Sequence, residues 1–105
     1  MSYKIVVKES ADLDTTAIET YLAACDVSPE VVLAPIAARI TKDLTEFPYM
    51  YPVCQFDERF RQMPVKSYLV LYHVDEEKRL VEIHHIWHGK RNIIKLLKEN
   101  RNTES

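Results

Sequence analysis

The feature that most constrains the fold is the run from Val65 to Trp87, VKSYLVLYHVDEEKRLVEIHHIW. It contains two segments of β-branched and aromatic residues, separated by the charged residues 75–78. This pattern predicts two long antiparallel strands joined by a polar turn. The first segment is largely apolar on both of its alternating faces, which is typical of a central strand covered on both sides. We therefore expect this hairpin to form the middle of a sheet.

The segments before the hairpin predict one more strand and two helices. Residues 3–8 are β-branched and roughly alternating, as in a first strand. Ser10 offers a hydroxyl N-cap for a helix that runs to about residue 25. The apolar stripe of that helix is expected to consist of Leu13, Ala17, Tyr21 and Ala24. Ser28 and Pro29 predict the start of a second helix that ends near Phe47, with a kink or delayed start at Pro35.

The remaining segments complete a predicted order of β-α-α-β-β-β-α. Two prolines in FPYMYP end the second helix, and residues 53–60 are expected to hold a short edge strand. Gly89 ends the last strand, and residues 93–97 supply the buried side of a short C-terminal helix. This order predicts an α+β fold with two N-terminal helices packed on a small, mainly antiparallel sheet. We expect residues 1–105 to form a single domain.

Composition and charge restrict the classes of function. No apolar run reaches the roughly 18 residues of a membrane span, and the N-terminus lacks a signal-peptide pattern, so we expect a cytoplasmic protein with no membrane partner. Cys25 and Cys54 lack metal-site spacing and are expected to be two buried thiols. Residues 1–58 carry 4 Lys/Arg against 10 Asp/Glu, whereas residues 59–105 carry 10 against 6. This asymmetry suggests that one side of the fold meets an anionic partner, although the net charge of −2 argues against non-specific coating of nucleic acid.

Three kinds of chemical site do not fit the sequence HHIWHGKRN at residues 84–92. His84 and His88 would lie on one strand face but roughly 13 Å apart, too far to share a metal ion unless a β-bulge intervenes. No metal site and no cofactor are therefore expected. A serine nucleophile motif is absent. A phosphate-binding glycine loop is excluded, because the chain contains one glycine.

A cluster of cations and imidazole is the remaining candidate site. Antiparallel pairing through the 75–78 turn places the start of one strand beside the end of the other. The residues expected to meet there are Arg59, Arg61, Lys66, His88, Lys90 and Arg91. Arginine binds phosphate and histidine exchanges protons near neutral pH, which is what RNA cleavage without a metal requires. The alternative is a solvated basic rim in which His84 and His85 pack or lie at the edge.

From Tyr3 to Leu97 the chain resembles the RelE/ParE superfamily of toxins from bacterial type II toxin–antitoxin systems. The resemblance rests on the order and spacing of LTEFPYMYP, RFRQMPVKSYLVLYHVDEEKRLVEIHHI and HGKRN. It implies a RelE-like fold and a cognate antitoxin as partner. RelE-like members cut mRNA on the ribosome without a metal, whereas ParE-like members inhibit DNA gyrase and have no nuclease centre.

The resemblance carries over to individual residues only in part. For the nuclease branch it implies phosphate binding by Arg91, a place among the basic residues for Arg61 and proton transfer by His88, so these three are the expected catalytic residues. The cationic cluster itself supplies Arg59, Lys66 and Lys90 as the expected RNA-binding residues. Two features depart from that branch: Leu69 stands where arginine is common, and NIIKLLKEN lacks a tyrosine. The sequence therefore leaves three hypotheses, with a slight preference for the first: a ribosome-dependent mRNA endonuclease, a gyrase inhibitor, and an inactive antitoxin-binding protein.

Overall fold

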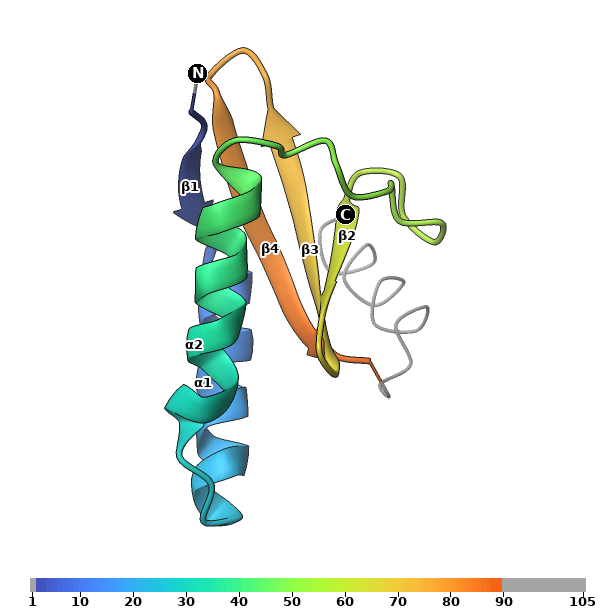
Figure 1. Cartoon of the computed structure of the whole chain (residues 1–105). Coiled ribbons are helices and arrows are strands. Elements are labelled where there is room, and N and C mark those ends of the chain that lie inside the picture. Colours follow the sequence, from blue (N-terminus) through green and yellow to red (C-terminus); the bar gives the residue numbers. More distant parts are fainter. Residues whose placement is uncertain (1, 90–105) are drawn as a thin grey trace.

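Two helices cover one face of a four-stranded sheet in the computed structural model, which describes residues 2–89 (Figure 1). The elements are β1 (Lys4–Val7), α1 (Glu9–Ala24), α2 (Pro29–Arg39), a π-helical turn η1 (Ile40–Leu44), β2 (Arg61–Val65), β3 (Tyr68–Asp75) and β4 (Leu80–His88). The strand order is β1-β4-β3-β2; β1 runs parallel to β4, and the other neighbours are antiparallel. The predicted α+β architecture is confirmed, while the predicted C-terminal helix lies outside the described residues.

The predicted hairpin forms the centre of the sheet. β3 and β4 pair from Tyr68↔His88 to Asp75↔Leu80, and the backbone amide of Lys78 donates to the Asp75 carboxylate, 3.1 Å away, within the turn. β3 is flanked by β4 and β2, as its apolar composition predicted. Both edges of β3 are thus paired with neighbouring strands, and its two faces each contribute side chains to a core.

Apolar side chains form one core on each face of the sheet. The larger core lies on the face that α1 and α2 cover, which we call the helix face, and it includes Val70, Tyr72, Ile83 and Ile86. The smaller core lies on the opposite face and consists of Cys54, Phe60, Leu71 and Trp87, with Leu69 packed against it. Residues 53–60 thus contribute to the second face without forming a strand.

The N-terminal part of α1 completes the edge of β4 beyond the short strand β1. The backbone amide of Lys8 donates to the Ile83 carbonyl, 2.9 Å away, and the Ser10 hydroxyl donates to the His84 carbonyl, 2.6 Å away. The prediction that Ser10 caps the helix is therefore wrong: Lys8 is the N-cap, and Ser10 lies in the first turn. β1 ends at Val7, opposite Ile83, so the next carbonyl of β4, that of His84, has no partner on β1. The Ser10 hydroxyl donates to this carbonyl instead of capping the helix.

Helix α2 begins where the sequence predicted and ends earlier. Pro29 follows the N-cap Ser28, although the Ser28 side chain makes no capping hydrogen bond. Pro35 lies inside α2, so it does not delay the start of the helix. The helical segment ends at Leu44 through η1 rather than near Phe47.

The predicted strand at residues 53–60 is wrong. Only Val53 forms an isolated bridge, to Arg61, and the edge strand is β2. Asp57 N donates to the Cys54 carbonyl and Phe60 N donates to the Asp57 carbonyl, so this segment turns repeatedly instead of extending. The edge strand thus begins at Arg61, eight residues later than predicted, which changes the position of Arg61 in the sheet.

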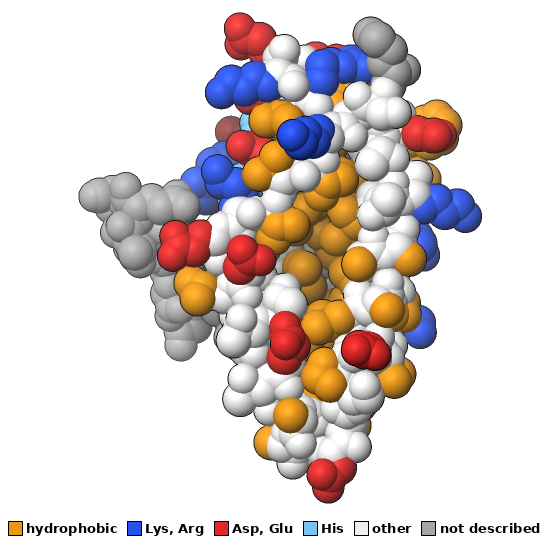
Figure 2. All heavy atoms as spheres, turned by 90° about the vertical axis from the view of Figure 1, so that its left-hand side faces the viewer, with side chains coloured by type: hydrophobic (Ala, Val, Ile, Leu, Met, Phe, Trp, Pro, Cys, Tyr) orange, Lys and Arg blue, Asp and Glu red, His pale blue; other side chains and the backbone are white. Residues whose placement is uncertain are grey.

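The predicted apolar stripe of α1 faces solvent instead of the core. Leu13 and Tyr21 are exposed, whereas Ala11 and Leu22 are buried. Both sets recur at helical spacing, and packing against the sheet selects the second. Figure 2 shows the left-hand side of Figure 1, where hydrophobic side chains form a band along the middle of the molecule.

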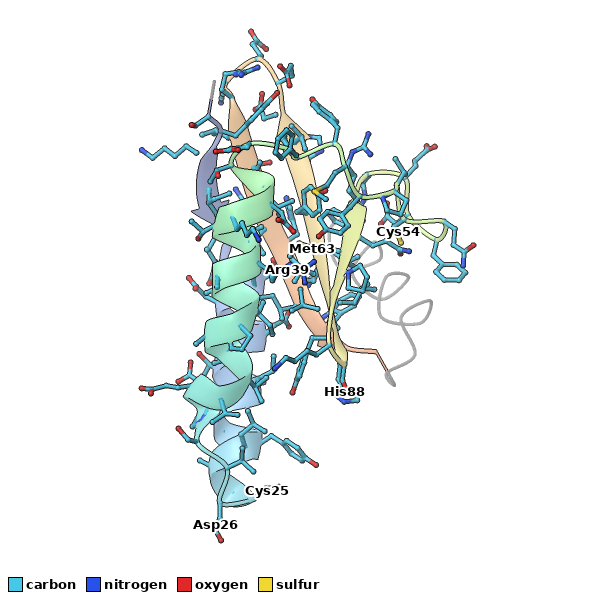
Figure 3. All side chains as sticks on the ribbon, viewed as in Figure 1. Cys25, Asp26, Arg39, Cys54, Met63 and His88 are labelled. Atoms are coloured by element: carbon cyan, nitrogen blue, oxygen red, sulfur yellow. The ribbon has the colours of Figure 1, made fainter. Side chains whose placement is uncertain are left out.

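Two further expectations concern the cysteines and membranes. Cys54 is buried, but Cys25 is exposed near the tip of the helical hairpin, so the expectation of two buried thiols is wrong for Cys25 (Figure 3). Among the described residues, no helix is long and apolar enough to cross a membrane.

Candidate functional site

A β-bulge in β4 separates the histidines that simple alternation places together. Leu71 pairs with His85 and Tyr72 pairs with Ile83, so His84 is the extra residue. His84 and His85 both contact the Phe60 ring, with centroid distances of 5.0 and 6.1 Å. The bulge shifts the alternation by one residue, which places His88 with Ile86 on the helix face. The prediction that His84 and His88 share a face is therefore wrong.

His88 forms the corner of the sheet together with Tyr68. Their rings meet edge to face, with centroids 5.2 Å apart, and the two residues are directly paired across β3 and β4. Figure 3 shows His88 at the end of the sheet that the helical hairpin extends beyond. The histidine is thus held at a site where a partner can reach it.

The turn between β2 and β3 lies against this corner. Lys66 and Ser67 form a two-residue loop, in which Lys66 has a left-handed φ of 54°. Gly89 donates its backbone N–H to the Ser67 carbonyl, 2.8 Å away, and a Cβ at Gly89 would lie 3.3 Å from that oxygen. The only glycine of the chain therefore permits the close approach that brings Lys66 to the His88 corner.

Two hollows meet at Tyr68 and His88. The first, of about 490 Å³, we call the turn groove. It is lined by Gln55, Phe56, Gln62, Pro64, Lys66, Ser67, Tyr68, Leu69, His88 and Gly89. The second, of about 410 Å³, we call the α1–β4 groove. It is lined by Asp14, Ala17, Ile18, Tyr21, Tyr68, Ile86 and His88.

Arg61 does not lie near His88, contrary to the sequence prediction. It pairs with Tyr72, four residues along β3 from the Tyr68↔His88 pair, which corresponds to roughly 13 Å. Its guanidinium donates to the Tyr51 carbonyl, 2.7 Å away, and lies over the Tyr49 ring. Arg61 therefore holds the segment after η1 against the start of β2.

Arg59 is also engaged within the protein. Its guanidinium donates to both carboxylate oxygens of the buried Asp57, with a shortest distance of 2.7 Å, and lies over the Phe60 ring. Of the predicted site residues, the structure brings together Lys66 and His88; Lys90 and Arg91 lie outside the described residues. Their assigned roles in binding or cleaving RNA stay predictions.

Asp14 and Tyr68 are residues of this corner that the sequence analysis did not select as site residues. One carboxylate oxygen of Asp14 accepts from the backbone amide of Ile86, 3.2 Å away, and lies 3.1 Å from Nδ1 of His85. His85 in turn stacks on Trp87, with ring centroids 4.3 Å apart. No sequence motif marks this contact, because it joins residues more than 70 positions apart.

His84 lies in a separate hollow on the second face, beside Arg59, Phe60, His73 and Glu82. Burial lowers the pKa of His84, and the nearby Glu82 carboxylate opposes that shift. Glu82 lies 3.8 Å from the His84 imidazole and 3.8 Å from the Lys8 ammonium. Within residues 2–89, no group of three or more His, Cys, Asp or Glu side chains is arranged to hold a metal ion.

Comparison with known proteins defines the family. Residues 5–93 match the family model described as the ParE toxin of the type II toxin–antitoxin system parDE. The chain belongs to the ParE toxin family. It is therefore a toxin of a type II toxin–antitoxin system, within the RelE/ParE superfamily that the sequence resembled. No curated protein matches the chain in sequence.

Solved structures of related toxins share the ParE-family fold of this chain. The RelBE2 toxin–antitoxin complex of Mycobacterium tuberculosis matches with a TM-score of 0.65 and 19% identity over 84% of this chain and 99% of that chain. The chromosomal ParDE system of P. aeruginosa matches with a TM-score of 0.69 and 15% identity, over 84% of this chain and 97% of that chain. A mutant of the E. coli toxin RelE in the free state matches with a TM-score of 0.64 and 14% identity, over 96% of this chain and 98% of that chain. Toxins of both branches thus have this fold, and an antitoxin is the expected partner of this chain.

Proposed function

We propose that this chain inhibits growth as ParE-like toxins do, by binding DNA gyrase rather than by cutting RNA. The observation that carries the proposal is the separation of Arg61 from His88 along the sheet. The match to the ParE toxin family supports the same branch.

The separation matters because RNA cleavage without a metal needs several groups at one phosphate. A base, an acid and cations must all lie within hydrogen-bond reach of the reacting atoms. Arg61 is roughly 13 Å from the His88 corner along the strands. The Arg59 guanidinium binds the buried Asp57 carboxylate. Either arginine would have to break these contacts to reach a phosphate bound beside His88.

Ribosome-dependent mRNA cleavage is the second candidate, because the turn groove holds Lys66, Tyr68 and His88 together. A lysine supplies charge for a phosphate, and an imidazole beside a phenol supplies groups for proton transfer. Lys90 and Arg91, which the sequence analysis placed in the candidate RNA site, directly follow Gly89 in the sequence. Their contribution would decide this alternative.

Inducible expression of the full chain without its antitoxin tests the proposal. A DNA-damage reporter is followed together with primer extension on a translated mRNA. We expect growth arrest, a DNA-damage response and no codon-phased cuts. Phased cuts that disappear with His88→Gln, but persist with the exposed His73→Gln as control, would overturn the proposal in favour of the nuclease. Absence of growth arrest would also overturn it and leave only an antitoxin-binding role.

A further inference from the structure

The hollow around His84 lies apart from the two grooves that meet at His88. Its volume is about 260 Å³, and it is lined by Arg59, Phe60, His73, Glu82 and His84. The His84 ring contacts the Phe60 ring, with centroids 5.0 Å apart, and lies 3.8 Å from the Glu82 carboxylate. His84 thus occupies a partly apolar site that also contains charge.

Every element packed around His84 contributes a charged or titratable group. These groups are Glu82 and His85 of β4, His73 of β3, Lys8 at the start of α1, Asp14 of α1 beside His85, and Arg59 with its bound Asp57. Arg59 already binds the Asp57 carboxylate, and Glu82, the carboxylate beside His84, also lies 3.8 Å from the Lys8 ammonium. A proton on His84 therefore adds a charge that only this shared carboxylate balances.

The folded chain favours the neutral form of the His84 ring. Burial lowers the pKa of His84, the Glu82 carboxylate opposes that shift, and His85, Lys8 and His73 add to the lowering. An exposed imidazole takes up a proton near pH 6.5. Below that pH, proton uptake therefore favours any conformation in which the ring has left the hollow.

His84 also joins α1 to the part of β4 that extends beyond β1 (Figure 1). It is the bulge residue of β4, and its carbonyl accepts the Ser10 hydroxyl, 2.6 Å away. The extra residue of a bulge has no cross-strand partner. The backbone of His84 is therefore held mainly by the Ser10 hydroxyl and by its own ring in the hollow.

Two further hydrogen bonds flank the contact of His84 with α1. The Lys8 amide donates to the Ile83 carbonyl, 2.9 Å away, and the Ile86 amide donates to the Asp14 carboxylate, 3.2 Å away. Asp14 and Ile86 also line the α1–β4 groove. Opening of this edge would therefore change the wall of the groove that reaches His88.

We propose that His84 is a pH-sensitive switch: its neutral ring holds the β4 bulge against α1, and its protonation opens this edge locally while the rest of the sheet stays folded. The shape of the α1–β4 groove then depends on pH. The inference goes beyond the proposed function and does not depend on the target of the toxin, because it concerns contacts within this chain alone.

Amide hydrogen exchange of the full-length chain, followed by NMR, tests the switch. Protection factors, which correct for the pH dependence of intrinsic exchange, are compared at pH 7.5 and 5.5 for the amides of Lys8 and Ile86 and for those in the centre of β3. We expect the two edge amides to be less protected than the β3 amides, because the edge opens without global unfolding. Their protection should fall by about threefold to tenfold at pH 5.5, since tenfold is the limit for one histidine one unit below its ordinary pKa.

Three variants assign the switch to His84. His84→Gln removes the titrating ring and should abolish the fall in protection of the edge amides. His88→Gln, which removes an imidazole from the same strand outside the hollow, is the matched control and should keep the fall. Glu82→Gln removes the carboxylate that offsets the charge of protonated His84, so the fall should continue to lower pH.

Several results would overturn the inference. Equal protection of the edge and β3 amides would mean that the edge opens only with the whole molecule. An unchanged fall in His84→Gln, or its loss in His88→Gln, would show that another group is responsible. The ring resonances of the unmodified chain give a test that needs no variant: a His84 ring that titrates at or above pH 6.5 would also contradict the switch.

Discussion

Asp14 joins α1 to the end of β4 through one carboxylate oxygen, which faces both the Ile86 amide and the His85 ring. Replacing Asp14 by alanine leaves a β4 edge amide without its acceptor. We expect Asp14→Ala to lower the free energy of unfolding by about 1–3 kcal/mol. Urea unfolding measures the change, with the exposed Glu19→Ala on the same helix as control. Equal stability of the two variants would contradict this role for Asp14.

His84 should make stability depend on pH in a defined window. Burial lowers its pKa from the ordinary 6.5, so below that pH the unfolded chain binds the proton more readily than the folded chain. The free energy of unfolding should therefore fall as the pH drops below 6.5 and through the folded-state pKa. Unfolding curves from pH 7.5 to 5 measure this, and His84→Gln should flatten the profile in that window. A profile of His84→Gln that parallels the unmodified chain would contradict this assignment.

At the scale of elements, Arg61 connects β2 to the segment that follows η1. Its guanidinium donates to the Tyr51 carbonyl and stacks on Tyr49. We expect Arg61→Ala to lower the free energy of unfolding by about 1–3 kcal/mol, because it removes a charge-assisted hydrogen bond. The exposed turn residue Lys78→Ala is the control. A stable Arg61→Ala variant that has lost growth inhibition would instead favour a direct role in binding or cleavage.

The elements show which features the sequence can predict. The β3–β4 hairpin was predictable because its alternation and polar turn are local. The β4 bulge was not, because HHIWH is compatible with burial on either face, so alternation carries no sign of an extra residue. Arg61 was expected beside His88 because it closely precedes the central strand. The structure instead places it at the start of β2, four residues along β3 from the Tyr68↔His88 pair.

In helix α1, too, the sequence alone does not determine which face is buried. Two apolar stripes recur along it at helical spacing, and the sequence analysis selected the one through Leu13 and Tyr21. Contacts with β4 decide the matter, since Ser10 and Asp14 bind its edge and turn Ala11 and Leu22 inward. Of the site, the sequence identified His88 and Lys66 correctly as neighbours, whereas Asp14 and Tyr68 required the fold.

At the scale of the whole molecule, charge and apolar surface are distributed unevenly. The helical hairpin carries acidic charge and exposed apolar side chains, while the basic half of the chain begins near β2. The hairpin and the basic half of the chain therefore carry net charges of opposite sign. The mode of inhibition that we propose for this chain is binding to DNA gyrase without cleavage of RNA.

A supercoiling assay with purified gyrase distinguishes gyrase inhibition from RNA cleavage. The full-length chain is added to gyrase and relaxed plasmid, with and without the antitoxin. We predict that supercoiling is inhibited as the toxin approaches the concentration of gyrase, and that the antitoxin restores it. Undisturbed supercoiling, combined with cleavage of a translated mRNA by the same preparation, would contradict gyrase inhibition and assign the His88 corner to RNA cleavage.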